Sequence, residues 1–548
     1  MSSEDKVSAP KKTAKSRILL FSAIAWISAV AIYGCTLSFD FIWDDCGVIT
    51  HNQDIRSIRT AIDSFWRSRD SFKDYDPSQM THEIYRPLRT VAHSVLYKYW
   101  GLNPLPYHAA NILAHATVAV LAFLLFWRLM GNAGAALCGG LVFALHPVNT
   151  EVVCWAKSLE DLFAALFVLG SLHLFLSALA PRKGTLPLWL GAGILYALAL
   201  FAKASVIFFP VFLVGFLCIR LLKLPGMTRL PAPRASAWAF CGACGILGMA
   251  FLCIRHIVMG KTAQGAFITG NCWTTWLSMP RVFLRYMRLE FVPVDLLADY
   301  EAYPYAHKLS EFTPWLFAIL FVLIFCGITW LLIRARSGLG LCAWLWFWAA
   351  LLPFSNIIPM LQLGAERFLY IPTIGFACFC ALGFASWKLE RPALKNCLLV
   401  FVLASFAVLS FGRSLDWKDE ISLWEATLPQ APSSPRVQHN LAKAYLGVGR
   451  PQDCLTVAEK LWKQCPTKEY AAFYGFALCR AGRSMEGVPL LVKLKNHVVL
   501  NIVGAEAASQ GQADLADYCF KMAMEFAPDK QEYQSNLKKL HSKEQPSQ

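Results

Sequence analysis

Apolar runs of about twenty residues recur along most of the chain, and they restrict the possible folds more than any other feature. Each run is long enough to cross the hydrocarbon core of a bilayer as one helix. Hydrophobic residues make up 56% of the chain and charged residues only 16%. The predicted fold class is therefore all-α, with a polytopic membrane domain. About eleven membrane helices are expected, at residues 18–37, 108–128, 133–148, 159–180, 186–202, 204–222, 236–256, 314–333, 339–355, 368–387 and 395–412.

The distribution of Lys and Arg predicts the orientation of these helices. The tail of residues 1–17 contains the basic stretch KKTAKSR, so it is expected in the cytoplasm, followed by a retained helix rather than a removed signal peptide. The alternate loops that should also be cytoplasmic are all basic: PRKG (181–184), RLLKLPGMTRLPAPR (220–234), RARSG (334–338) and KLERPALK (388–395). The net charge of +15 is thus explained by Lys and Arg in short loops that set the orientation of the helices, and no nucleic-acid partner is expected. An odd number of crossings places the C-terminal region outside, in the periplasm or the ER lumen.

The first outer loop, residues 38–107, begins with the acidic stretch FDFIWDDCGVITHN (39–52). Asp44 and Asp45 are neighbours in this loop, so their side chains are expected to point in different directions and to have different roles. One carboxylate could accept a proton from an acceptor hydroxyl while the other orients that hydroxyl. Burial beside a like charge would raise the pKa of one of the two aspartates. The alternative is a solvated loop pair, with Asp44 acting as a helix cap.

A polar stripe follows in the same loop and enters the second apolar run. Arg86 directly precedes a proline, so it lies at a turn or a helix start, where it could bind a phosphate with two donors. His108 and His115 are seven residues apart and therefore share one helix face. Such a stripe indicates a polar cavity. The alternative is a hydrogen-bonded structural stripe, and a zinc site lacks a third ligand.

Further polar candidates lie at the outer ends of later helices. His146 and Glu151 belong to the corner HPVNTE (146–151). Lys203, in FAKAS, lies between two apolar runs and could bind an anion or extend to the interface as an ordinary surface lysine.

The last outer segment ends in GAERFLYIP, which contains Glu366, Arg367 and Tyr370. An arginine at the outer head of a helix can bind an anionic headgroup. The alternative is a simple ion pair between Glu366 and Arg367.

The composition changes near residue 415, where a helical repeat begins. Ala444 precedes Gly449 by the same offset as Ala477 precedes Gly482, 33 residues further on. This spacing is typical of tetratricopeptide repeats (TPRs) and predicts three helical hairpins within 415–540, the middle one degenerate. Stacked hairpins leave a concave face for a peptide or partner. The alternative is a generic helical cap.

Six motifs, in order, together resemble one family. They are FIWDDCGVITHN, YRPLRTV, GLNPLPYHAANILAH, ALHPVNTEVV, LPFSNIIP and AERFLYIPTIGF, followed by the repeats. Their order closely resembles the transmembrane and tetratricopeptide-repeat O-mannosyltransferases, which are GT-C glycosyltransferases. The resemblance covers most of the chain and implies a GT-C membrane domain over 18–414 with TPRs after it.

The resemblance also implies an activity and a set of site residues. The family transfers a sugar, mannose in its animal members, from a polyprenyl-phosphate carrier to a Ser or Thr of a protein outside the membrane. Its motifs fall on Asp44, Asp45, Arg86, Glu366, Arg367 and Tyr370. This chain departs from the family at Asn149, in KSLED (157–161) and at Ala204, which leaves the sugar and the acceptor open. The small number of repeats favours a bacterial relative, in the inner membrane with periplasmic TPRs; a eukaryotic one would have ER-lumenal TPRs.

Together these points predict a mechanism. Asp44 is expected as the base, supported by Asp45, while Arg86 and Arg367 bind the carrier phosphate with Lys203 in reserve. The supporting polar residues are His108, His115, His146, Glu151, Glu366 and Tyr370. Direct displacement would invert the sugar carbon. No metal or other cofactor is expected, since the DYD triplet at 74–76 is typical of a solvated turn.

Two other functions remain open. One is a transferase that acts on a lipid or glycan acceptor. The other is a non-enzymatic protein, either a membrane-anchored TPR scaffold or a transporter, although the paired halves typical of transporters are missing from the sequence.

Overall fold

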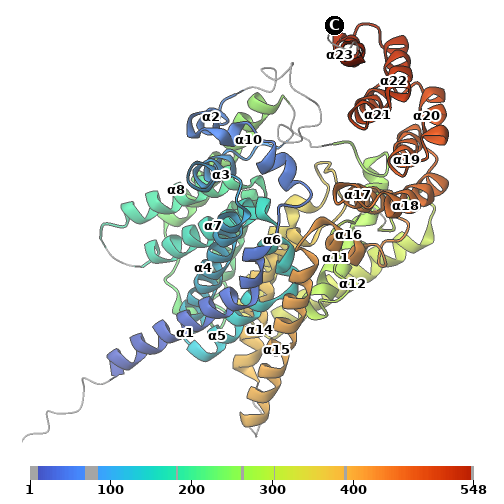
Figure 1. Cartoon of the computed structure of the whole chain (residues 1–548). Coiled ribbons are helices and arrows are strands. Elements are labelled where there is room, and N and C mark those ends of the chain that lie inside the picture. Colours follow the sequence, from blue (N-terminus) through green and yellow to red (C-terminus); the bar gives the residue numbers. More distant parts are fainter. Residues whose placement is uncertain are drawn as a thin grey trace, which may run out of the picture. The chain divides into compact units, whose positions relative to one another are not determined.

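The computed structural model describes residues 10–67, 84–180, 183–260, 265–300, 303–387 and 392–544 (Figure 1). The chain forms two compact units. We call Met1–Ser422 the membrane unit and Leu423–Gln548 the hairpin unit. The division falls a few residues after the predicted boundary at 414/415, because the chain around Trp417 packs with the membrane unit.

The described residues of the membrane unit contain helices and turns and no β-strand. Its α-helices are α1 (Pro10–Tyr33), α2 (Ile58–Asp63), α3 (Pro87–Trp100), α4 (Pro104–Met130), α5 (Ala133–Leu145), α6 (Thr150–Cys154), α7 (Leu159–Ala178), α8 (Leu186–Ala202), α9 (Phe209–Leu221), α10 (Ala235–Met259), α11 (Cys272–Phe291), α12 (Phe312–Arg334), α13 (Gly338–Leu351), α14 (Pro372–Ser386), α15 (Pro392–Asp416) and α16 (Glu420–Thr427), which runs on into the hairpin unit. The all-α prediction is confirmed for these residues.

Every predicted apolar run coincides with a helix. Seven are long and apolar enough to cross a membrane alone: Lys15–Ser38, Pro104–Met130, Ala156–Ala178, Ala204–Leu221, Ala235–Met259, Phe312–Arg334 and Ala393–Asp416. Three shorter apolar helices lie at Leu186–Ala202, Gly338–Phe354 and Pro372–Ser386. By length and composition, this is a multi-pass membrane protein.

The helix predicted at 133–148 ends at Leu145, and the predicted corner HPVNTE (146–151) follows it directly. Ala133–Leu145 and Pro147–Cys154 meet at an angle of 45°. His146 has extended backbone angles (φ −71°, ψ 125°), as expected for a residue before proline. The bend brings the corner that contains Glu151 into the interior of the unit, where Glu151 is fully buried.

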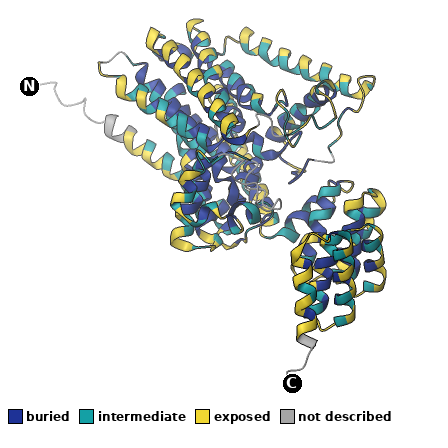
Figure 2. Ribbon diagram, turned by 90° about the horizontal axis from the view of Figure 1, so that it is seen from above, coloured by how far each residue is buried: buried dark blue, intermediate teal, exposed yellow. Residues whose placement is uncertain are grey.

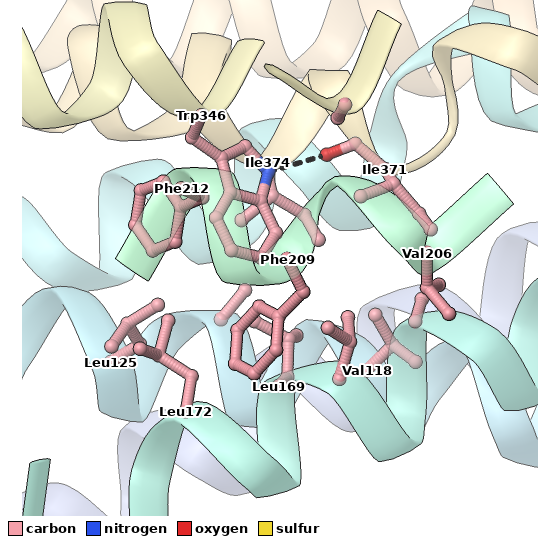
Figure 3. Close-up of a cluster of buried hydrophobic side chains, with 14 of the residues drawn as sticks. Val118, Leu125, Leu169, Leu172, Val206, Phe209, Phe212, Trp346, Ile371 and Ile374 are labelled. Atoms are coloured by element: carbon pink, nitrogen blue, oxygen red, sulfur yellow. Dashed lines mark hydrogen bonds between the residues drawn. The ribbon is translucent and has the colours of Figure 1, made fainter. Parts of the chain in front are cut away.

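The core of the membrane unit is a continuous apolar cluster shared by α4, α5, α7, α9, α13 and α14. Figure 3 shows Phe209, Phe212 and Trp346 packed together, with Trp346 Nε1 donating to the Ile371 carbonyl at 2.8 Å. Glycines allow the closest helix approaches. A Cβ on Gly375 of α14 would lie 2.7 Å from the Ala343 carbonyl of α13, and one on Gly139 of α5 would lie 2.8 Å from the Ala377 carbonyl.

The hairpin unit contains three antiparallel helix pairs followed by a last helix. The pairs are α17 (Pro435–Gly447) with α18 (Pro451–Gln464), α19 (Lys468–Arg480) with α20 (Ser484–Lys493), and α21 (His497–Ser509) with α22 (Ala513–Phe526), and α23 (Gln531–Glu544) follows. Buried residues line the inner sides of these helices (Figure 2). Three hairpins agree with the predicted repeat.

The turns explain the glycine spacing. Gly449, Gly482 and Gly511 each connect the two helices of a pair, with φ of 74°, 82° and 75°. Only glycine adopts such angles without steric cost. The middle pair is the irregular one, since α20 has ten residues and contains Pro489.

Candidate functional site

The acidic turn after α1 is built around Asp45. Its Oδ2 accepts a hydrogen bond from the Ile42 backbone N–H at 3.1 Å, and its Oδ1 accepts one from the Lys157 backbone N–H at 2.8 Å. Burial raises the pKa of Asp45 to about 7, although these two donors oppose the shift. Asp45 therefore ties the first outer loop to the segment before α7, which makes it a positioning residue.

Asp44 has a different environment, as its neighbouring position in the turn predicted. Its Oδ2 accepts from Lys157 Nζ at 2.5 Å, and its side chain remains 25% exposed. Its Oδ1 forms no hydrogen bond with any described residue. Burial would raise the pKa of Asp44, but the cations of Lys157, Arg367 and Arg89 outweigh it and hold this pKa below its ordinary value. Asp44 is thus ionised at neutral pH, with one oxygen open to a ligand.

Aromatic rings support this turn. Trp43, whose backbone is in the left-handed region (φ 53°), stacks on Trp155 at 4.6 Å, and Lys157 Nζ lies 3.9 Å above the Trp155 ring. Trp417 packs against Trp155 at 5.6 Å. The Trp43 N–H donates to Glu420 Oε1 at 2.9 Å. Residues 417–420 therefore pack against the turn through Trp417 and Glu420.

Glu160 and Asp161, in the first turn of α7, bring three more cations to this place. Glu160 pairs with Arg86 and, at 2.5 Å, with Arg89 Nη1. Asp161 pairs with Lys203 Nζ. Arg86 lies at the N-terminus of α3 just before Pro87, and Lys203 follows the last residue of α8. Lys203 is buried, so the alternative of a lysine that extends to the interface is wrong.

Arg367 completes the set. Its Nη1 donates to Glu151 Oε1 at 2.5 Å and its backbone N–H to Glu151 Oε2 at 2.8 Å, while its Nη2 contacts Gln362. The alternative of an ion pair between Glu366 and Arg367 is therefore wrong. The two residues are adjacent in a short 3-10 turn, and their side chains have different partners.

The cations lie close enough to lower one another's pKa values. Burial and the guanidinium groups of Arg89, Arg367 and Arg255 lower the pKa of Arg86 to about 9, against the opposing effect of Asp161. Burial also lowers the pKa of Lys203 to about 8, helped by Arg86 and Arg367 and opposed by Asp161. We call the set the charged cluster: Asp44, Asp45, Arg86, Arg89, Glu151, Lys157, Glu160, Asp161, Lys203 and Arg367.

The remaining predicted residues have partners outside this cluster. His115 Nδ1 lies 2.8 Å from the Tyr370 hydroxyl, and its Nε2 lies 3.1 Å from the Ala144 carbonyl. His146 Nδ1 accepts from the Val148 N–H, which leaves Nε2 to donate to the Glu290 carbonyl at 3.0 Å.

His108 and Glu366 are also separate from the cluster. The His108 ring meets Phe39 edge to face at 6.3 Å. Glu366 accepts from the Leu297 N–H and, at 3.3 Å, from the Tyr300 hydroxyl, and burial raises its pKa to about 8. Within the described ranges, no hydrogen bond or ion pair joins His108, His115, His146, Glu366 or Tyr370 to the charged cluster. Of the six supporting residues, only Glu151 is a member.

Four cluster members were not predicted as site residues. Lys157, Glu160 and Asp161 stand at or just before the start of the helix expected over 159–180, where acids suit the helix dipole and need no other role. Arg89 was not predicted as a site residue, although it follows Arg86 by three residues and so lies on the same helix face.

The described residues contain no group of three or more His, Cys, Asp or Glu side chains with the spacing of a metal site. The DYD triplet at 74–76 lies outside the described residues. Metal independence stays a prediction.

Comparison with known proteins identifies relatives. The chain is 24% identical over 469 residues to Protein O-mannosyl-transferase F38B6.6 of Caenorhabditis elegans, covering 79% of this chain and 61% of that protein. It is 22% identical over 574 residues to human Protein O-mannosyl-transferase TMTC3, covering 92% and 60%. Along most of its length the chain is thus similar in sequence to proteins named as protein O-mannosyl-transferases. Mouse Protein O-mannosyl-transferase TMTC2 is 33% identical over a shorter stretch of 168 residues, covering 30% of this chain and 20% of that protein.

Two further comparisons set the limits of this relationship. The chain spans about three fifths of the length of the two proteins that match most of it. No family model matches the chain. Among solved structures, ArnT from Cupriavidus metallidurans bound to undecaprenyl phosphate has a TM-score of 0.41 and 14% identity, over 91% of this chain and 80% of that one. This likeness is too weak to transfer a site or a ligand.

Proposed function

We propose that the protein is a membrane glycosyltransferase that moves a sugar, mannose in the first instance, from a polyprenyl-phosphate carrier to a Ser or Thr hydroxyl of a protein. The single observation that carries the proposal is the charged cluster, in which an ionised, partly exposed Asp44 lies among five cations at the position of the acidic motif. The relationship to protein O-mannosyl-transferases supports the reaction class and the protein acceptor.

Asp44 is suited to act as the base. The acceptor hydroxyl gives its proton to Asp44 Oδ1, and its oxygen forms a bond to the sugar C1. The bond from C1 to the carrier phosphate oxygen breaks, and the phosphate keeps the electron pair, so C1 is inverted. Asp45 holds the turn in place through two backbone N–H groups and does not touch the reacting atoms.

Arg86 and Arg367 are suited to hold the departing phosphate. A guanidinium group has five N–H donors, so each can pair with its carboxylate and still bind a second anion. Arg86 contacts Glu160 through one nitrogen, and Arg367 contacts Glu151 and Gln362 through two. Lys203 is buried in an ion pair with Asp161 and adds positive charge to the charged cluster. The donor is a co-substrate, and the proposal includes no metal or other cofactor.

The site is placed on the outer face, in the bacterial inner membrane or, in a eukaryote, the ER membrane. The alternation of basic loops supports this orientation, since it puts Asp44, Lys203 and Arg367 at the same side of the bilayer. The hairpin unit then lies outside as well, where a protein acceptor is available.

The test compares the wild type with Asp44→Asn in transfer of label from polyprenyl-phosphate mannose to membrane proteins of the source cell. Loss of a base lowers kcat by roughly 10²- to 10⁴-fold, while Asp63→Asn, at an exposed carboxylate of the same loop, should leave kcat unchanged. Label that is released from protein by mild alkaline β-elimination identifies a Ser or Thr linkage. Full activity of Asp44→Asn would refute the mechanism, and label in lipid alone would refute the protein acceptor.

A further inference from the structure

Gln362 contacts the arginine that the proposed function assigns to the carrier phosphate. Arg367 Nη2 donates a hydrogen bond to Gln362 Oε1. A guanidinium group has donors and no acceptor, so the amide must present its oxygen to Arg367. The partner thus decides between the two orientations of this amide, and the NH₂ group of Gln362 is turned away from Arg367 Nη2.

The NH₂ group of Gln362 keeps two N–H donors for a ligand. Gln362 is half-buried, its Nε2 is accessible, and no hydrogen bond joins this atom to another described residue. Both oxygens of Glu151, the carboxylate that pairs with Arg367, accept from Arg367 itself. The two donors therefore lie beside a guanidinium group, and no described carboxylate receives them. Because hydrogen bonds to an ionised acceptor are the stronger ones, the ligand favoured at this place is an anion.

The chain directly after Gln362 is held in place by α11. Leu363 is 4% exposed and belongs to an apolar cluster that includes residues of α11. The Tyr286 hydroxyl of α11 accepts from the Ala365 N–H at 2.9 Å and donates to the Ala365 carbonyl at 3.2 Å. The backbone position of Gln362 is therefore fixed before a ligand binds, which lowers the entropy lost on binding.

The chain before Gln362 presents apolar side chains to the outside. Ile357, Ile358 and Leu361 are 59%, 52% and 51% exposed. In a membrane protein, such surface favours contact with a lipid tail over contact with water. Apolar surface for a lipid tail therefore begins one residue from the amide that contacts Arg367.

We propose that the amide N–H groups of Gln362 bind the phosphate of the polyprenyl-phosphate carrier, beside Arg367. This assignment rests on the proposed function for the identity of the carrier. Gln362 Oε1 orients the guanidinium group, and Gln362 Nε2 donates to a phosphate oxygen that Arg367 also binds. Gln362 lies in MLQLG (360–364), between the motifs LPFSNIIP and AERFLYIPTIGF, so it is a substrate-binding residue that the motifs in the sequence do not contain.

The first test asks for direct contact between the amide nitrogen and the phosphate. The full-length protein, with ¹⁵N in the side-chain amides of its glutamines, is saturated with undecaprenyl phosphate in a phosphate-free detergent. Solid-state NMR then measures the dipolar coupling between ¹⁵N and the ³¹P of the lipid. We expect one coupled nitrogen, at the separation of a hydrogen-bonded pair. Its signal should be absent in Gln362→Met and present in the matched control Gln53→Met, at an exposed glutamine of the same unit.

The second test measures affinity by calorimetric titration of the same protein. Gln362→Met should weaken binding of undecaprenyl phosphate roughly 10- to 100-fold, the range for a hydrogen bond to a charged group. Binding of the uncharged undecaprenol should not change, and Gln53→Met should bind undecaprenyl phosphate as the wild type does. An unchanged Kd for Gln362→Met, or an equal loss in Gln53→Met, would overturn the proposal.

Further ligands separate the possible sources of the signal. A loss confined to undecaprenyl-phosphate mannose would place Gln362 at the sugar and overturn the assignment to the phosphate. Phosphatidylglycerol that bound as tightly and coupled to the same nitrogen would overturn the assignment to the carrier. A wild type that bound neither undecaprenyl nor dolichyl phosphate would refute the proposed function and this assignment with it. Binding without ¹⁵N–³¹P coupling in the wild type would refute the assignment of Gln362 alone.

Discussion

The buried pairing of Glu160 with two arginines leads to a quantitative prediction. Glu160 is 5% exposed, and the side chains of Arg86 and Arg89 are 14% and 5% exposed. Glu160→Gln keeps the shape but leaves both guanidinium groups buried against a neutral amide. Removing one partner of a buried ion pair costs about 3–5 kcal/mol. Because the amide oxygen can still accept one N–H, we expect the lower end, about 3 kcal/mol of unfolding free energy.

The control is an exposed pair in the same unit. Arg288 and Asp295 lie 3.3 Å apart with side chains 44% and 61% exposed, and such pairs contribute at most about 1 kcal/mol. Asp295→Asn is a fair replacement because Asn tolerates the positive φ of 58° at this position.

The assay is titration of the detergent-solubilised protein with SDS, followed by the fluorescence of its 19 tryptophans. Glu160→Gln should unfold at a clearly lower SDS fraction than the wild type, and Asp295→Asn at almost the same fraction. Equal midpoints for the two variants would refute the view that the charged cluster is a tightly coupled, desolvated network.

Three further predictions follow from the same geometry. Asp45→Asn places an amide NH₂ against one of two backbone N–H groups, which should cost about 1–3 kcal/mol in the same SDS titration, and an unchanged midpoint would contradict the tethering role. Lys157→Met removes the cation that holds the pKa of Asp44 low, so burial raises this pKa. The acid limb of the plot of kcat/KM against pH should therefore move to higher pH. An acid limb that does not move would exclude Asp44 as the titrating base. Gly482→Ala should destabilise the hairpin unit by about 1–2 kcal/mol because the φ of Gly482 is 82°. The control Gly447→Ala, in a helix with open space at the Cβ, should stabilise the unit by about 0.5 kcal/mol. Melting temperatures, measured by circular dichroism, that shift in the same direction for both variants would contradict this prediction.

The helices could be predicted because the length of each apolar run and the charges between runs are local properties. The end of a helix at His146 was also predictable, because the residue before a proline is disfavoured in helical conformation. The hairpins were predictable for a similar local reason, since Gly449 and Gly482 repeat the same turn.

The site was only partly predictable because its pairs join distant parts of the chain. Arg89 and Glu160 are 71 residues apart, and Arg367 and Glu151 are 216 apart. From sequence alone, the acid at 160 fitted a helix start, and Arg367 had an obvious neighbour in Glu366. Ion pairing depends on which way each side chain points in the folded chain, and adjacent residues of a short turn point apart.

The contacts of residues 417–420 decide how this protein can be shortened. Trp417 packs on Trp155, and Glu420 accepts the Trp43 N–H, so both stabilise the turn that presents Asp44. A chain that stopped at residue 414, where the composition changes, would lose both contacts. Inactivity of that shortened chain would say nothing about whether the hairpins recruit an acceptor. A chain that ends at Thr427, the last residue of α16, keeps both contacts, and it is the form in which membrane chemistry and acceptor recruitment can be measured separately.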